Sequence, residues 1–179
     1  MTDKNNFKIM PFDILDSTSA KAKEISAAAE PWTVVVAKEQ RGGYGRKGGA
    51  WFSPAGGLYF SVVLPKSNVD DLQILTILAA FCVAKTIKDN YSVEPFVKLP
   101  NDVYLNGKKI CGILTENIIS GEVKSSVIGI GVNTNIDAFS ADLANPTSLK
   151  IELGQTIDNN FILVHIISQL QQIFKAISR

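Results

Sequence analysis

Glycine is concentrated in one short segment, and this concentration restricts the possible folds more than any other feature of the sequence. Seven of the 13 glycines lie between residues 42 and 57, in a segment that also contains Pro54. Because glycine and proline both disfavour helices, this segment predicts a loop between strands. Residues 33–37, Thr-Val-Val-Val-Ala, precede the loop and are typical of a buried strand.

The glycine-rich loop contains the pattern Gly-x-Gly-x-x-Gly, at Gly43, Gly45 and Gly48. In a dinucleotide-binding fold, the third glycine of this pattern opens a helix. Here Pro54 and another pair of glycines follow, so a helix cannot begin well at that point. The sequence therefore argues against a dinucleotide-binding fold.

The same loop carries Arg41, Arg46 and Lys47, and it ends at Trp51. Backbone N–H groups beside fixed positive charge form a site for anions such as phosphate. An aromatic residue on a glycine-rich loop can also fold over a bound ligand. We interpret the loop as part of an anion-binding site, and the alternative is a solvated linker.

The composition favours one cytoplasmic domain over residues 1–179. The chain is 46% hydrophobic, enough for one sizeable core, and its net charge of +1 argues against a general attraction to nucleic acid or membrane. The N-terminus is too polar for a secretory signal, and the apolar stretch at 72–83 is too short to span a bilayer. Cys82 and Cys111 lie in apolar runs and are typical of core thiols in a reducing compartment.

Strands joined by short turns dominate the expected fold. Asn106-Gly107 is a strong hairpin-turn pattern, and Ser120-Gly121 predicts a second turn. The pattern indicates an α+β fold with a mixed, mainly antiparallel sheet and helices packed on one side. Strands are expected near residues 7–15, 32–38, 58–64, 95–98, 102–106, 109–118 and 123–132, and helices from a cap at 16–18 to about 29, over 70–89 and over 159–177.

Several segments, in chain order, resemble the motifs of biotin protein ligases. Residues 98–102, Lys-Leu-Pro-Asn-Asp, are similar to the family motif Lys-Trp-Pro-Asn-Asp, and residues 40–54 resemble the family's adenylate-binding loop. The resemblance spans nearly the whole chain and implies a fold like that of class II aminoacyl-tRNA synthetases and biotin synthetases. The other matching segments are Asp16-Ser17-Thr18, residues 109–114, residues 129–133 and residues 146–149.

The resemblance implies an enzyme that ligates biotin to a lysine of a biotin carboxyl carrier domain. The biotin carboxylate would react with the α-phosphate of ATP to form biotinyl-5′-AMP, which the carrier lysine would then attack. Such a site needs fixed cations, N–H donors and Mg²⁺. The single histidine, His165, gives little support to a histidine-based triad or a His/Cys metal centre, so we expect no metal ligands from the chain itself.

The resemblance also implies roles for individual residues. Catalytic roles fall to Arg46, Lys98 and Lys109, whose charges would hold the reacting anions. The implied biotin-binding residues are Ser17, Thr18, Ser19, Gln40, Gly43, Tyr44, Gly45, Lys109, Gly112, Gly129 and Gly131. The implied ATP-binding residues are Arg46, Lys47, Trp51, Asn101 and Asn133.

These assignments have structural alternatives. Ser17 could serve only as a helix cap, Lys98 only as an ion-pair partner, and Trp51 only as a core residue. The glycines could occupy turns or bulges. The loop also departs from the family pattern, because Tyr44 and Gly49 stand where arginine is usual.

The family pattern sets expectations for organisation and partners. The first strand begins almost at once, which leaves no room for an N-terminal DNA-binding domain, and the chain ends before the small C-terminal β-barrel that relatives commonly have. We expect no partner among nucleic acids or membranes, and a homodimer fits the family. Two alternatives stay open: a lipoate- or octanoate-transferring relative, which usually has an Arg-Arg-x-Ser-Gly-Gly-Gly loop, and a non-catalytic module that binds biotin or its adenylate.

Overall fold

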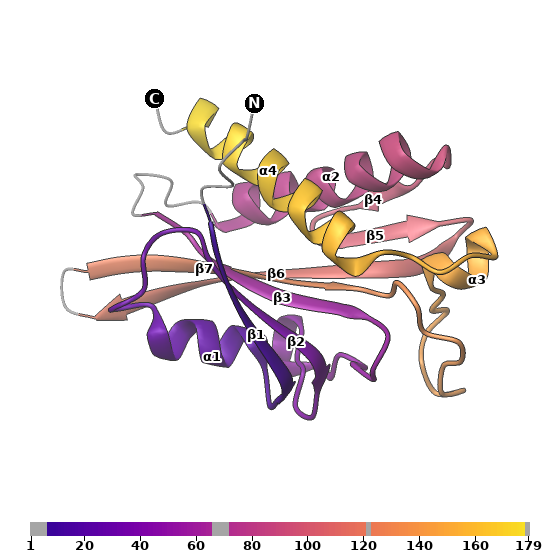
Figure 1. Cartoon of the computed structure of the whole chain (residues 1–179), viewed down its shortest axis with the longest axis horizontal. Coiled ribbons are helices and arrows are strands. Elements are labelled where there is room, and N and C mark those ends of the chain that lie inside the picture. The colour runs from indigo at the N-terminus through magenta and orange to yellow at the C-terminus, as the bar shows by residue number, and fades with distance from the viewer. Residues whose placement is uncertain (1–6, 66–71, 121–122, 178–179) are drawn as a thin grey trace.

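A computed structural model describes residues 7–65, 72–120 and 123–177, and in them a seven-stranded sheet is the main feature (Figure 1). The strands are β1 (Lys8–Leu15), β2 (Thr33–Gln40), β3 (Leu58–Val63), β4 (Phe96–Lys98), β5 (Asp102–Leu105), β6 (Lys108–Ser120) and β7 (Val123–Val132). The helices are α1 (Thr18–Ile25), α2 (Leu72–Tyr91), α3 (Leu149–Leu153) and α4 (Asn159–Ile177), with one turn of 3₁₀ helix, η1, at Arg46–Gly48.

The sheet is mixed and mainly antiparallel, as predicted. Its strand order is β1-β2-β3-β7-β6-β5-β4, and β1 and β2 are its parallel pair. The connection through α1 explains this pair, because parallel neighbours need a crossover rather than a tight turn. The other neighbours are antiparallel, and the register of the central pair sets Gly112 opposite Gly131.

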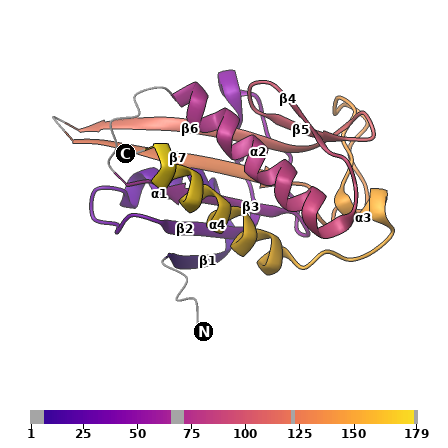
Figure 2. The same cartoon turned by 90° about the horizontal axis from the view of Figure 1, so that it is seen from above.

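The two long helices, α2 and α4, cover one face of the sheet, and the short α1 lies against the other (Figures 1 and 2). The main core therefore lies between the sheet and the long helices, and each fully buried aliphatic or aromatic side chain contributes about 1.5–3 kcal/mol to stability. A smaller cluster under α1 contains Ala22, Val35, Val63 and Val127. Large buried side chains of the main core include Phe60, Ile87, Ile110, Ile128, Ile162 and Ile166.

Helix α1 is shorter than expected. The Ser17 hydroxyl caps its start by accepting a hydrogen bond from the Ala20 N–H at 3.3 Å. The helix ends at Ile25 rather than near residue 29, because Ser26 donates both its N–H and its hydroxyl to the Lys23 carbonyl. The start of the helix, at Thr18, lies beside Gln40 at the end of β2.

The predicted turn at Asn106-Gly107 is confirmed, with positive φ at both residues (52° and 76°). The predicted turn at Ser120-Gly121 lies partly outside the described residues. Helix α3 was not expected, although Ser148 caps its start and Gly154 ends it in the left-handed conformation (φ 67°).

Helix α4 follows the predicted apolar spacing except at its start. Phe161 is 39% exposed, and its ring lies 4.0 Å from that of His165. The apolar spacing of residues 159–177 predicts core positions for Phe161 and His165, and the structure corrects this, because Phe161 is exposed and His165 is only partly buried. None of the described helices is long and apolar enough to cross a membrane.

Candidate active site

A cleft of about 390 Å³ opens where α1, the loop after β2 and the strands β5, β6 and β7 meet. It brings together side chains that are far apart in the sequence, and most of the residues predicted for the site line it. These are Ser17, Thr18, Ser19, Gln40, Tyr44, Gly45, Arg46, Lys47, Trp51, Asn101, Lys109, Gly112, Gly129 and Gly131. The predicted residues Gly43, Lys98 and Asn133 do not line this cleft.

One end of the cleft is a chain of buried hydroxyl groups that leads to Gln40. The Gln40 Oε1 accepts from the Thr18 N–H at 2.8 Å and from the Thr18 hydroxyl at 3.1 Å. The Ser61 hydroxyl donates to Thr18 Oγ1 at 2.9 Å, so Ser19, at 3.0 Å from Ser61, must be the donor to Ser61. Each proton in the chain therefore has a defined direction.

This hydroxyl chain continues into the loop that covers the cleft. The Gln40 amide donates to Ser53 Oγ at 2.9 Å, and the Ser53 hydroxyl donates to the Trp51 carbonyl at 2.9 Å. A Cβ atom at Gly43 would lie 2.6 Å from Ser53 Oγ, which explains the glycine there. Gly43 thus supports the packing of the loop from outside the cleft.

The indole of Trp51 lies against the two opposed glycines of β6 and β7. A Cβ atom at Gly131 would lie 2.3 Å from Trp51 Nε1, and one at Gly112 would lie 2.9 Å from Cζ3. The family resemblance implied that these glycines bind biotin. In the structure they make room for the indole. The space above Gly129 is taken in the same way by Ser19, whose Oγ would lie 2.3 Å from an added Cβ.

The other end of the cleft is charged. The Lys109 Nζ lies 2.7 Å from Asp102 Oδ1, although the angles are not those of a hydrogen bond. It also lies 5.3 Å from the centre of the Trp51 ring. Across the cleft, Arg46 Nη1 donates to Asn101 Oδ1 at 3.1 Å, and the Asn101 amide donates to the Ile113 carbonyl at 3.3 Å. Among the described residues, three cations therefore line the cleft, and two of them, Lys109 and Arg46, each contact a residue of the 98–102 motif, while Lys47 is the third.

Lys98 is not brought to this charged end. It lies on β4, the outermost strand, where it is exposed and its Nζ is 5.2 Å from the Tyr104 ring centre. The prediction that Lys98 supports the same anions finds no support in this arrangement. Asp102, to which the sequence analysis gave no role, is the carboxylate nearest to Lys109.

The backbone of Lys109 is fixed on both sides by the segment before α3. Its N–H donates to the Asn145 carbonyl at 3.0 Å, and its carbonyl accepts from the Thr147 N–H at 3.0 Å. Asn133 is buried, and its amide donates to the Thr147 carbonyl at 3.0 Å, which ties β7 to the same segment. Asn133 therefore helps to hold the segment that fixes the Lys109 backbone.

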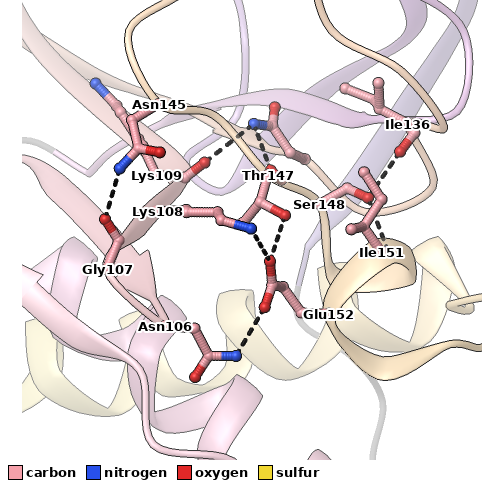
Figure 3. A network of polar contacts seen from close by, with 11 residues as sticks. Asn106, Gly107, Lys108, Lys109, Ile136, Asn145, Thr147, Ser148, Ile151 and Glu152 are labelled. Carbon is pink, nitrogen blue, oxygen red and sulfur yellow. Dashed lines mark hydrogen bonds and ion pairs between the residues drawn. The ribbon is translucent and has the colours of Figure 1, made fainter.

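Glu152 joins this segment to the Asn106-Gly107 turn (Figure 3). Its carboxylate accepts from the Thr147 hydroxyl at 2.7 Å and from the Asn106 amide at 2.7 Å. Lys108 lies 3.4 Å from the same carboxylate. The hydrogen bond from Thr147, with smaller contributions from Asn106 and Lys108, holds the pKa of Glu152 below its usual value.

A second cavity, of about 230 Å³, adjoins the cleft and shares Ala50, Trp51 and Lys109 with it. Its wall is more apolar, and the Phe52 and Phe139 rings lie 6.1 Å apart. The remaining lining residues are Tyr104, Asn133, Leu143, Ala144 and Pro146. The site as a whole is a polar, charged cleft beside an apolar cavity, with Trp51 and Lys109 between them.

Comparisons with known proteins agree with this arrangement. Residues 12–133 match the model of the Biotin/lipoate A/B protein ligase family. The Bifunctional ligase/repressor BirA of Bacillus subtilis (strain 168) is 37% identical over 162 residues, which cover 87% of this chain and 50% of that protein. The Biotin--[acetyl-CoA-carboxylase] ligase of Paracoccus denitrificans is 34% identical over 151 residues, which cover 80% of this chain and 63% of that protein.

Among solved structures, the biotin protein ligase from Aquifex aeolicus in complex with biotin and ATP is similar, with a TM-score of 0.86. The two are 27% identical, and the match covers 96% of this chain and 72% of that one. The fold is therefore the class II synthetase-like α+β fold that the sequence predicted. The chain spans about half the length of the Bacillus subtilis relative it matches.

Proposed function

Because the chain belongs to the biotin/lipoate A/B protein ligase family, we propose that it activates biotin with ATP and transfers it to a carrier lysine. The biotin carboxylate attacks the α-phosphate of ATP, which forms biotinyl-5′-AMP and releases pyrophosphate. The lysine amine then attacks the acyl carbon, which forms an amide and releases AMP. The observation that carries this proposal is one cleft with directed hydroxyl groups at one end and positively charged side chains at the other.

The hydroxyl chain suits the ureido ring of biotin. That ring presents a carbonyl oxygen and two N–H groups, which need donors and acceptors in fixed directions inside a small pocket. We propose that Ser17, Thr18, Ser19 and Gln40 supply them, with Tyr44 and Gly45 closing the side of the pocket. Gly112, Gly129 and Gly131 act indirectly, by making room for Trp51 and Ser19.

The charged end suits the reacting carboxylate and phosphate. Lys109 and Arg46 are the proposed catalytic cations, with Lys47 beside them on the loop. Each cation already has a polar partner, Asp102 or Asn101, from which it can turn to a substrate anion. Such preorganised charges lower the barrier because they need little rearrangement as charge develops.

We place the nucleotide base in the apolar cavity beside Trp51. That cavity is lined by aromatic rings, which can pack against adenine, and Lys109 lies between it and the cleft. Asn101 would hold the nucleotide next to Arg46. Asn133 contributes to the wall of the cavity, and its amide is already bonded to the Thr147 carbonyl.

The family also implies Mg²⁺, which accompanies ATP. In the described part of the chain, no group of three or more His, Cys, Asp or Glu residues could hold a metal ion by itself. Asp102 is the carboxylate in the cleft lining, and its Oδ1 lies 2.7 Å from the Lys109 Nζ. One carboxylate together with substrate phosphates is a usual environment for Mg²⁺, so Asp102 fits this role. The ion would neutralise phosphate charge.

The proposed acceptor is the carrier domain of a biotin-dependent carboxylase, the class named for the Paracoccus denitrificans relative. We also propose that the described residues form a single catalytic unit, that the protein acts in the cytoplasm, and that it assembles as a homodimer. The net charge of +1 supports a protein partner over nucleic acid.

Pyrophosphate release tests the proposal against a lipoate- or octanoate-transferring enzyme. We expect release with biotin and ATP, and little with lipoate or octanoate, because those acids cannot pair with the buried hydroxyls around Gln40. Equal rates with all three acids would overturn the assignment to biotin. Tight biotin binding without pyrophosphate release would indicate a non-catalytic module.

The same assay tests the catalytic cation. We expect Lys109→Ala to lower adenylate formation by roughly 10²–10³-fold, which is the usual cost of losing one preorganised group. The matched control is Lys108→Ala, which removes the neighbouring lysine at the surface and should keep nearly full activity. Near-normal adenylation by Lys109→Ala would mean that the chemistry is elsewhere.

A further inference from the structure

The loop over the cleft is a hydrogen-bonded hairpin. The Trp51 N–H donates to the Gly43 carbonyl at 2.9 Å, and the Gly45 N–H donates to the Gly49 carbonyl at 2.7 Å. Tyr44 pairs with Ala50 across the hairpin, whose tip is the single 3₁₀ turn η1. This hairpin carries Arg46, so its position sets where the cation lies.

Two side-chain hydrogen bonds tie the hairpin to the sheet. One runs from Arg46, which is exposed, to Asn101, which is partly buried. The other runs from the Tyr44 hydroxyl to Glu116 Oε2, at 2.9 Å. Glu116 lies on β6, and its second oxygen is 2.7 Å from the Lys23 Nζ of α1. Lys23 also lies 5.4 Å from the centre of the Tyr44 ring.

The Tyr44–Glu116–Lys23 cluster is better shielded than the Arg46–Asn101 contact. The Lys23 and Glu116 side chains are 33% and 24% exposed. Burial, together with Glu116, raises the pKa of Tyr44, so its hydroxyl stays protonated near neutral pH and can donate. A hydrogen bond to a charged, partly buried acceptor is stronger than one between neutral groups.

In the proposed function, Arg46 exchanges Asn101 for a substrate anion. This exchange breaks one of the two side-chain hydrogen bonds that connect the hairpin to the sheet. The Tyr44–Glu116 hydrogen bond can persist through this exchange, because neither residue carries a positive charge that the anion would attract. We propose that Glu116 is a positioning residue, which holds the hairpin over the cleft through Tyr44 while Arg46 changes partner. This inference rests on the proposed function, but the hydrogen bond itself can be tested without substrate.

Four substitutions separate the contacts of the cluster. Tyr44→Phe removes the hydroxyl and keeps the ring, and Glu116→Ala removes both contacts of the carboxylate. Glu116→Gln keeps an acceptor for Tyr44, and Lys23→Met removes only the ammonium group. The matched control is Glu24→Ala, which breaks the Lys21–Glu24 ion pair of 2.6 Å on the same helix.

Hydrogen exchange of the free protein measures how readily the hydrogen bonds of the hairpin open. We expect the Gly45 and Trp51 amides to exchange roughly 10-fold faster in Tyr44→Phe and Glu116→Ala, which corresponds to the loss of one hydrogen bond to a charged group. Glu116→Gln should give a smaller increase than Glu116→Ala, since a neutral amide still accepts the hydrogen bond but less strongly. Lys23→Met and Glu24→Ala should stay close to the wild-type rates. Thermal unfolding of each variant shows whether an effect is confined to the hairpin.

Steady-state kinetics with ATP test whether Glu116 positions Arg46. We expect Glu116→Ala to raise the KM for ATP by about 10-fold and to lower kcat as well, because the hairpin sets the position of Arg46, which is proposed to hold the anion and to stabilise the transition state. Glu116→Gln should raise the KM less than Glu116→Ala does, because it keeps an acceptor for Tyr44. The affinity for biotin without ATP should change less than the KM for ATP in Glu116→Ala, since Thr18 and Gln40 lie outside the hairpin and only Tyr44 and Gly45 of the proposed pocket belong to it.

Three outcomes would overturn the inference. Unchanged exchange in Tyr44→Phe would mean that its hydroxyl does not hold the hairpin. Equal effects of Glu116→Gln and Glu116→Ala would assign the role to the ion pair with Lys23. A looser hairpin with an unchanged KM for ATP would make Glu116 a merely structural residue. If the wild-type protein does not bind biotin, the proposed function fails, and the exchange experiment still reports on the hydrogen bond.

Discussion

Ser61 shows how much a single side chain can organise in this site. It is fully buried in β3, donates to Thr18 and accepts from Ser19. Its hydroxyl therefore connects the two α1 side chains that face the cleft. Every hydroxyl in this series donates in one fixed direction. Removal of the Ser61 hydroxyl therefore takes a hydrogen-bond partner from both Thr18 and Ser19.

We expect Ser61→Ala to weaken biotin binding by roughly 10-fold, since it leaves the buried hydroxyls of Thr18 and Ser19 incompletely paired. The KM for ATP should change little, because the charged end of the cleft keeps its contacts. Calorimetry with biotin is the direct measurement. Ser126→Ala, which removes an exposed hydroxyl bonded to Asn117, is the control. An unchanged biotin affinity in Ser61→Ala would mean that the hydrogen-bonded hydroxyls are not part of the biotin pocket.

The sequence pointed to Thr18, Gln40, Arg46 and Lys109, and the structure brings all four to one cleft. Nothing in the sequence indicated a role for Ser61. A single serine in an apolar strand is not unusual, and its partner Thr18 lies 43 residues away. Which side chains meet across such a distance depends on how α1 packs against β3, and local sequence patterns do not specify this packing.

At the scale of elements, the turn before β6 and the short helix α3 act together through Glu152. Its side chain is 9% exposed and accepts hydrogen bonds from Thr147 and Asn106. The turn itself was predicted from Asn106-Gly107, because positive φ at two consecutive positions favours that pair of residues. Helix α3 was missed because five residues carry too little apolar periodicity, although its caps were readable.

Glu152→Gln should lower the free energy of unfolding by about 1–2 kcal/mol at neutral pH, since a neutral amide accepts these hydrogen bonds less strongly. The pKa of Glu152 is lowered in the folded state from its usual 4.5, so its contribution to stability is complete above 4.5. That contribution is lost as the pH falls through the folded-state pKa. Urea unfolding of both proteins across acidic pH measures this. A difference that does not shrink in acid would contradict it.

Over the whole molecule, α2, α4 and five strands share one core, and both cysteines are in it. Cys82, on α2, and Cys111, on β6, are 1% and 0% exposed. Burial raises the pKa of Cys82 to about 12 and also raises that of Cys111. The prediction of two core thiols is therefore confirmed, and neither is available for reaction in the folded protein.

We expect thiol reagents to label both cysteines only when the core opens, and at similar rates, because one cooperative unit protects them. Saturating biotin should slow the labelling, since a ligand that binds only the folded state stabilises it. Mass spectrometry after timed labelling measures each site separately. Fast reaction of either thiol at neutral pH without denaturant would show that the core opens locally.

The packing of Trp51 on Gly112 and Gly131 has a consequence for the evolution of this chain. A methyl group at either glycine would collide with the indole, within 2.9 Å at one and 2.3 Å at the other. Neither glycine can drift to alanine while the tryptophan remains, and replacement of the tryptophan would free both glycines at once. Positions 51, 112 and 131 are therefore expected to be inherited as a unit, so that a change at one in a descendant is accompanied by changes at the others.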